Sequence, residues 1–340
     1  VPSDDTVGAA QIKDDLISGA TALASMNSDT SNYNVAVGYG AGTAVTTGTH
    51  NTFIGGLAGE DLTTGTYNVA VGYQALANED AHGKNVAVGA FSLQDLNAGA
   101  DAGNTALGYV AGSEMTTGVE NTIIGSWAGD ALLDGSSNVA IGHKALSGED
   151  GHGKNVAVGH QALEIQNAGA DAYNVAIGYD AGQAVTTGVK NTIVGGLAGD
   201  ALTVGENNVA VGYEALSTSV DGDKNVAIGK GALKVFEAGD GEGHNVAIGG
   251  NCMENSTTGL YNTGVGALVV SAGVMTGSYN TMMGYAAGNE MTSGDFNVLL
   301  GAACGDALTT GARNIAIGYF ALSAEDGHGR NIAIGYEALK

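Results

Sequence analysis

The 340-residue chain has one proline, two cysteines and 11 basic residues against 35 acidic ones. Its formal net charge of −24 leaves no basic stripe for phosphate contacts, so we expect no nucleic-acid partner. No stretch reaches the ~18 consecutive apolar residues of a membrane-spanning helix, so we expect no membrane insertion. Glycine supplies 58 residues, but the scarcity of proline and the absence of a glycine every third residue exclude a collagen triple helix.

The chain does have a repeat. The pentapeptide Asn-Val-Ala-Val-Gly at 34–38 returns in related form 17 more times, mostly at steps of 17 residues (51−34 and 68−51). A fixed period of this length is typical of a solenoid, which grows by stacking similar units. We therefore predict an all-β protein, a parallel β-solenoid of about 18 coils with repeats of ~17 residues.

Each coil is expected to contain two short strands and two turns. The pentapeptide is the first strand, and Tyr73–Leu76 is typical of the second. Strand alternation sends Val35 and Val37 to one face, which we expect inside, and Ala36 to the other, where it permits close approach of another backbone. A coil this thin buries little apolar surface alone. We therefore expect a homo-oligomer, since identical chains usually associate with cyclic symmetry.

Two parts of the chain are distinguished, residues 1–31 and the repeats at 32–340. In the first part Ile12, Leu16, Ala20 and Leu23 form a helical stripe, which predicts a short helix over roughly 8–24, followed by a polar linker. The chain begins without methionine and stops inside its eighteenth coil. We expect a segment of a longer protein or a processed product.

The two cysteines fit the repeat. Cys252 and Cys304 both take the eighth place of a coil, where alanine stands in most others, so we expect small buried substitutes for alanine. They lie three coils apart, or ~14 Å at one strand spacing per coil. That distance excludes a disulfide between them.

The repeats resemble two families. Asn104–Tyr109 (Asn-Thr-Ala-Leu-Gly-Tyr) and Asn138–Gly142 are similar to repeats of phage tail fibres, and to the left-handed β-roll heads of trimeric autotransporter adhesins. The likeness covers about residues 32–340, and 7–15 resembles a segment found ahead of such repeats in tail fibres. The resemblance implies a left-handed β-roll, a homotrimer, and a location in a virion tail fibre or at the cell surface. A membrane-anchor barrel, a coiled-coil stalk and a C-terminal self-cleaving chaperone domain are features of these families that this sequence does not contain.

The asparagine that opens each coil is interpreted as structural. Stacked amides bond along a ladder and cap tight turns. A row of recognition amides is the alternative. Representative ladder residues are Asn34, Asn51, Asn68, Asn104, Asn138, Asn174 and Asn208.

Three further groups are candidates for binding. Acidic, histidine-containing turns recur, and carboxylates beside histidine can hold a divalent metal. We interpret them as solvated corners and expect no metal or other cofactor; the candidates are Asp80, His82, Asp150, His152, Asp326 and His328. Longer loops, which are either binding loops or spacers, carry Asn97, Asp101, Asn167, Asp171 and Asp240. Tyrosines at the sixth place of many coils either close the coil edge or stack on sugars.

No recurrent serine, histidine and carboxylate set indicates catalysis, so we expect no enzyme. The leading hypothesis is a homotrimeric shaft that extends or presents a host-attachment apparatus, with a phage tail fibre as the favoured case. The alternative is a bacterial adhesin head that binds a cell-surface glycan or receptor through the longer loops.

Overall fold

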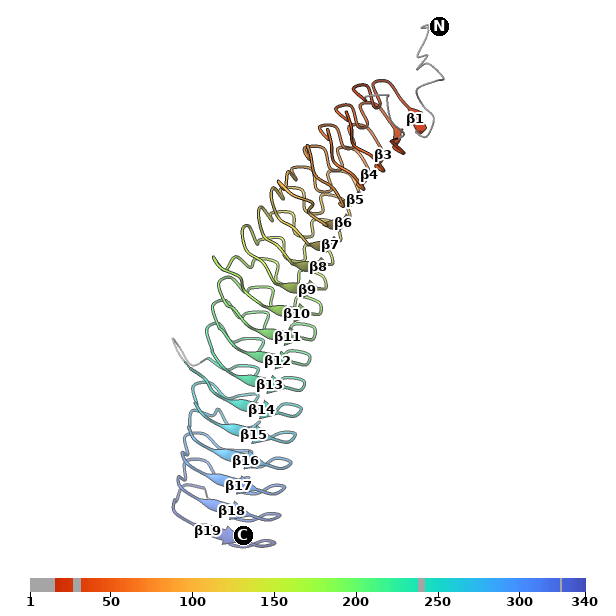
Figure 1. Ribbon diagram of the computed structural model, residues 1–340. Helices are drawn as coiled ribbons and strands as arrows, with labels where there is room; N and C mark the ends of the chain where they lie inside the picture. Colours follow the sequence, from red (N-terminus) through yellow and green to blue (C-terminus); the bar gives the residue numbers. More distant parts are fainter. Residues whose placement is uncertain (1–15, 27–31, 238–241, 325) are drawn as a thin grey trace. The chain divides into compact units, whose positions relative to one another are not determined.

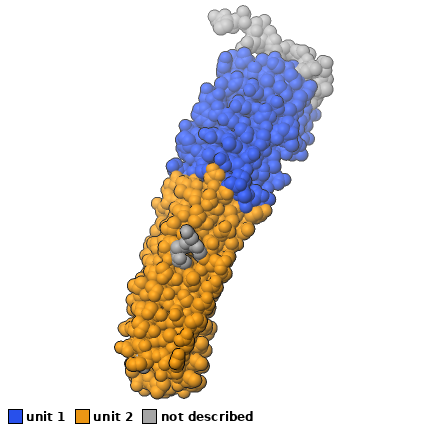
Figure 2. Space-filling model, turned by 90° about the vertical axis from the view of Figure 1, so that its left-hand side faces the viewer, with its two compact units in different colours: residues 1–160, 169–171 blue, residues 161–168, 172–340 orange. Residues whose placement is uncertain are grey.

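The computed structural model describes residues 16–26, 32–237, 242–324 and 326–340. They belong to two compact units (Figure 2). Unit 1 comprises residues 1–160 and 169–171, and unit 2 comprises 161–168 and 172–340. Within the described ranges there is no helix, and so none that is long and apolar enough to cross a bilayer.

Unit 1 is a ladder of parallel three-residue strands, one per coil (Figure 1). Each residue pairs with its equivalent in the next coil, as Val69 does with Val86. The strands are β1 Leu16–Ser18, β2 Val35–Val37, β3 Thr52–Ile54, β4 Val69–Val71, β5 Val86–Val88, β6 Thr105–Leu107, β7 Thr122–Ile124, β8 Val139–Ile141 and β9 Val156–Val158.

Unit 2 repeats this arrangement, and Val209 pairs with Val226 in the same register. Its strands are β10 Val175–Ile177, β11 Thr192–Val194, β12 Val209–Val211, β13 Val226–Ile228, β14 Val246–Ile248, β15 Thr263–Val265, β16 Thr281–Met283, β17 Val298–Leu300, β18 Ile315–Ile317 and β19 Ile332–Ile334. From β2 onward, every strand follows one of the repeated asparagines. The predicted all-β parallel solenoid is confirmed.

The second strand predicted for each coil is wrong. Its typical segment, 73–76, forms a turn in which Gln74 and Leu76 have φ of 53° and 52°, the left-handed region. The Gln74 N–H donates to the Gly56 carbonyl of the preceding coil at 3.0 Å. The Leu76 N–H donates to the Ser92 carbonyl of the following coil at 2.9 Å. The turn thus bonds to both neighbouring coils, which is why a second strand is unnecessary.

The predicted direction of the strand side chains is also wrong. The central residue of each strand from β2 to β19 is buried, and Ala36 is fully so. The flanking residues, Val35 and Val37 among them, are half-buried or exposed. The interior is narrow, so the strand centre has room for alanine beside the buried leucines of the turns, such as Leu76. Where Phe53 replaces that alanine, Gly59 leaves the space: a Cβ there would lie 2.3 Å from the Phe53 ring.

The predicted N-terminal helix is not observed in the part of it that the structure describes. Residues 16–18 form β1, which pairs with β2, and the following residues form a turn. Gly19 has φ of 126°, a value that does not occur in an α-helix. Gly19 takes the same position as the glycine that ends each of the other strands, which has a similar φ. Residues 8–15 of the predicted helix lie outside the described ranges.

Both cysteines are buried and free, as expected for substitutes of alanine. Burial raises the pKa of the Cys252 thiol to about 12 and that of Cys304 to about 11. Reactive thiolate chemistry is therefore not favoured at either position.

Candidate functional sites on the coil surface

Stacking one coil on the next turns each place in the repeat into a column of side chains. Places are numbered from the asparagine, place 1, to the residue before the next asparagine, place 17 in a 17-residue coil. Because the register is constant within each unit, a candidate site is a column or a corner that recurs in coils of one type.

The asparagines of place 1 lie inside the coils and bond from coil to coil. Asn51 donates its main-chain N–H to the Asn34 Oδ1 atom at 2.9 Å, and its Nδ2 donates to the Gly65 carbonyl at 2.9 Å. Equivalent main-chain to side-chain bonds occur at Asn68, Asn121, Asn138, Asn191 and Asn208. Asn104 and Asn174 direct Nδ2 to the Gly118 and Gly188 carbonyls. These side chains are buried, so the arrangement holds the fold and presents no amide to a ligand.

Two of the acidic turns bring three potential ligands together. Asp80 and His82 lie beside Glu79, and Asp150 and His152 lie beside Glu149, with one ligand atom from each residue within 4.8 Å of the other two. The glutamates are fully buried, a property that composition alone did not reveal. In the third turn the main-chain carbonyl of Asp326 accepts hydrogen bonds from Thr309 and Thr310. No such cluster is found around His328 in the described part of that turn, which leaves out residue 325.

The acidic residues of the longer loops act as tethers. Asp101 pairs with Lys84 at 2.8 Å and accepts the Gly83 N–H at 3.1 Å. The hydrogen bond from the Lys84 ammonium holds the pKa of Asp101 below its usual value. Asp171 makes the same two contacts with Lys154 and Gly153.

Unit 2 has a third tether of this kind. Glu242 pairs with Lys224 at 2.6 Å and lies 3.1 Å from the His244 Nε2 atom, and hydrogen bonds from these two side chains lower its pKa to about 2. The other loop candidates are bound through the backbone: the N–H groups of Asn97 and Asn167 donate to the carbonyls of Thr116 and Thr186. Asp240 lies outside the described residues.

The sixth-place tyrosines are exposed. Tyr73 and Tyr109 are each 49% exposed, and with Phe91 and Trp127 they form a row of edge-to-face contacts. Ring centroids in this row are 5.5 to 6.1 Å apart, with interplanar angles of 73° to 85°. We call these four residues the edge-to-face row. Its crossed rings leave parts of their faces open to solvent.

A second aromatic column was not predicted. It occupies the place just before the asparagine, where the backbone is left-handed, as at Tyr261 with φ of 57°. In unit 2 the rings of His244, Tyr261, Tyr279 and Phe296 stack at 4.9 to 5.0 Å, with interplanar angles of 1° to 10°. The Arg313 guanidinium lies 5.6 Å from the Phe296 ring centre. Because the inner rings cover each other's faces, this column offers edges to solvent and no stacking platform for a sugar.

The outward side of the strands is a continuous apolar surface in each unit. We call it the apolar ribbon: the first and third residues of every strand from β2 to β19. These are valine, isoleucine, threonine, leucine or methionine, with no charged residue among them. Ile54 and Ile177 are each 40% exposed and Ile248 is 36% exposed. An exposed apolar patch of this extent is typical of an interaction surface.

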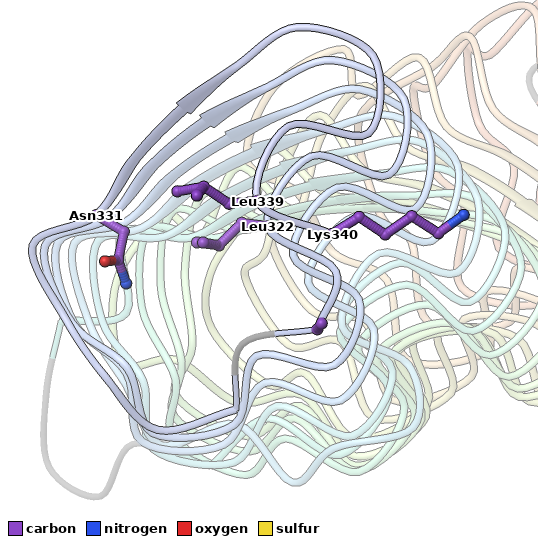
Figure 3. Close-up of a pocket in the computed structure, with 5 residues that line it drawn as sticks. Leu322, Asn331, Leu339 and Lys340 are labelled. Carbon is purple, nitrogen blue, oxygen red and sulfur yellow. The ribbon is translucent and has the colours of Figure 1, made fainter.

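One pocket lies at the last coil of unit 2 (Figure 3). It is lined by Leu322, Leu339, Asn331 and Lys340, together with Ala324. The two leucines, side by side in the figure, hold the ninth place, which is buried where another coil covers it, as at Leu216. Leu322 is buried and Leu339 is 59% exposed, so the pocket lies against core positions of the coils, and nothing in its lining is specific to a ligand.

Comparison with known proteins adds no identification: no model of a known protein family and no curated protein matches this chain.

Proposed function

We propose that this chain is a structural shaft segment that associates as a homotrimer and extends or presents an attachment apparatus, with a phage tail fibre on the virion as the favoured setting. The proposal assigns it no catalytic role. It rests on one observation, the apolar ribbon, which repeats from coil to coil and which the described residues leave half-buried or exposed. A surface that recurs at every coil suits a partner that also repeats at every coil.

A second copy of the same chain has that property. The net charge of −24 makes most faces of two copies repel each other, whereas the ribbon carries no charge. Burying valine and isoleucine there would contribute roughly 25 cal/mol per Å² of apolar surface. Three copies can place their ribbons around a common axis, which closes the assembly and leaves no ribbon exposed.

The number three and the left-handed winding of the coils come from the resemblance to tail fibres and adhesin heads. They are part of the proposal. A location at a bacterial cell surface is compatible with the same ribbon and the same symmetry.

Light scattering coupled to size exclusion tests the oligomer. We expect a mass of about 100 kDa, three times 33.5 kDa. The double variant Ile177→Glu with Ile248→Glu, both on the ribbon, should yield folded monomers, because burying carboxylates at the interface is unfavourable. Val204→Glu is the control, since Val204 is 47% exposed in a turn away from the ribbon. A folded wild-type monomer, or dissociation of the control, would overturn the proposal.

The alternative function, a glycan-binding module, is favoured by the edge-to-face row. Partly open ring faces in a line can stack on successive sugars. Binding to a bacterial surface polysaccharide should then fall at least tenfold in Trp127→Ala with Tyr109→Ala. The aromatic column variant Tyr279→Ala should bind as the wild type does. Equal binding by all three proteins would remove this alternative.

A further inference from the structure

Two corners of unit 1 repeat the same three-residue geometry. The Glu79 Oε1 atom lies 3.4 Å from Nδ1 of His82, and the Glu149 Oε1 atom lies 3.5 Å from Nδ1 of His152. Asp80 or Asp150 adds a second carboxylate, so all three ligand atoms lie within 4.8 Å of one another. The corners come from coils four repeats apart, and their spacing is Glu-Asp-x-His in both.

The glutamate of each corner occupies a core place. Place 12 holds Leu62, Leu96 and Leu132 in other coils, all fully buried, and Glu79 and Glu149 are equally buried there. A buried carboxylate is unfavourable unless a cation or several donors compensate it.

The compensation within the chain is incomplete. The main-chain N–H groups of His82 and His152 donate to the Oε1 atoms of Glu79 and Glu149 at 3.0 and 3.2 Å. No lysine or arginine pairs with either glutamate in the described part of the chain, since Lys84 is engaged by Asp101 and Lys154 by Asp171. The Glu79 Oε2 atom also accepts the Ala98 N–H at 3.4 Å. Neutral main-chain donors balance only part of a carboxylate charge.

Polar atoms at both corners are buried without a hydrogen-bond partner. They are Nδ1 of His82, Nδ1 of His152 and Oε2 of Glu149. Native proteins rarely leave such atoms unsatisfied, and an ion or a water at the site is a usual explanation. Each corner therefore directs two carboxylates and an imidazole nitrogen toward one another.

We propose that each Glu-Asp-x-His corner binds one divalent transition-metal cation, with Zn²⁺ the best match. Carboxylate oxygen and imidazole nitrogen are ligands for such ions, and two carboxylates balance the charge of the cation. Zinc bonds of ~2.0–2.1 Å in a tetrahedron separate neighbouring ligands by about 3.4 Å. The observed separations of 3.4 and 3.5 Å between Oε1 and Nδ1 agree with that value. The metal would fix the corner of the coil from inside, a role independent of oligomerisation.

The test uses the full chain after chelator treatment and dialysis. Zinc is added and measured by calorimetric titration and by metal analysis of the desalted protein. The double variant His82→Gln with His152→Gln should bind two zinc ions fewer than the wild type. His143→Gln with His160→Gln is the matched control: it removes a stacked pair of surface imidazoles, 5.3 Å apart, from the same unit. The control should keep the full zinc content.

A second double variant distinguishes loss of the metal site from misfolding, and circular dichroism would detect misfolding. Asp80→Asn with Asp150→Asn changes less buried carboxylates and should also lose two zinc ions. Zinc should raise the unfolding temperature of the wild type and of the control more than that of either corner variant. Absence of zinc binding by the wild type would overturn the proposal. Loss of zinc only in the His143/His160 control would assign the metal to the surface pair and overturn it as well.

Discussion

The asparagine side chain at the start of a coil bonds both to the following coil and to a later turn of its own coil. Asn191 receives the Asn208 N–H on Oδ1 at 2.9 Å and donates Nδ2 to the Gly205 carbonyl at 2.8 Å. All of these groups are buried from water. Asparagine is therefore required at this position, since no other side chain of this size supplies both a hydrogen-bond donor and an acceptor there.

Replacing Asn191 by alanine should destabilise the protein by roughly 2–6 kcal/mol, because it leaves two buried main-chain groups unpaired at ~1–3 kcal/mol each. Guanidinium unfolding followed by circular dichroism measures this. Asn78→Ala is the control, as Asn78 is exposed and its Nδ2 bonds to the Asp95 carboxylate at the surface. Equal unfolding midpoints for the two variants would contradict the role of the ladder.

The glycine that ends each strand is fixed by two constraints. Gly195 has φ of 138°, and a Cβ there would lie 2.5 Å from the Gly212 carbonyl oxygen. Gly195→Ala should cost on the order of 3 kcal/mol or more, combining backbone strain with a steric clash. Gly250→Ala is the control, since a methyl group there would have nothing within 4 Å and Gly250 does not require a positive φ. A thermal unfolding series compares the two, and equal losses of stability would contradict the argument.

At the scale of the coil, the sequence predicts the period, the first strand and its register, because one residue type recurs at the same place. Three features escaped prediction. The turn at 73–76 depends on left-handed φ values at Gln74 and Leu76. Because neither residue is a glycine, the sequence does not predict this backbone conformation. The direction of Val35 and Val37 depends on interior width, which alternation alone leaves open. The metal-binding proposal depends on Glu79 being buried, whereas charged residues are ordinarily expected at the surface.

The turns of some coils also carry carboxylates that affect stability with pH. Burial raises the pKa of Asp130, Asp200 and Asp306, all at place 10. The native state then holds these protons more tightly than the unfolded state. Their contribution is most favourable below the unfolded value of 3.8 and is lost as pH rises through the native pKa.

The triple variant Asp130→Asn, Asp200→Asn and Asp306→Asn should therefore gain stability at pH 7 and little at pH 3.5. Asp101→Asn should behave in the opposite way. Its native pKa is lowered by Lys84, so its contribution is present above 3.8 and disappears as pH falls through the native pKa. Urea midpoints at the two pH values check both signs, and a triple variant destabilised at pH 7 would contradict the argument.

At the scale of the whole chain, neighbouring coils supply nearly all of the contacts that hold each unit. Strands pair with the strand before and after, and the turn and asparagine bonds follow the same path. The stability of such an array is approximately a sum over coils and their interfaces. The apolar ribbon is the exception, because its side chains face away from the interior of the coils and remain half-buried or exposed.

That coil-by-coil ladder has a mechanical consequence. Tension applied to the two ends of a chain held as a monomer acts on one interface after another, so coils should detach singly. Each detached coil of 17 residues would lengthen the chain by about 50 Å, the extended length of ~3.4 Å per residue less one stacking distance of ~4.8 Å. Optical-trap records should show steps of that size that reverse on relaxation. A single cooperative rupture would show instead that force is shared across many coils at once.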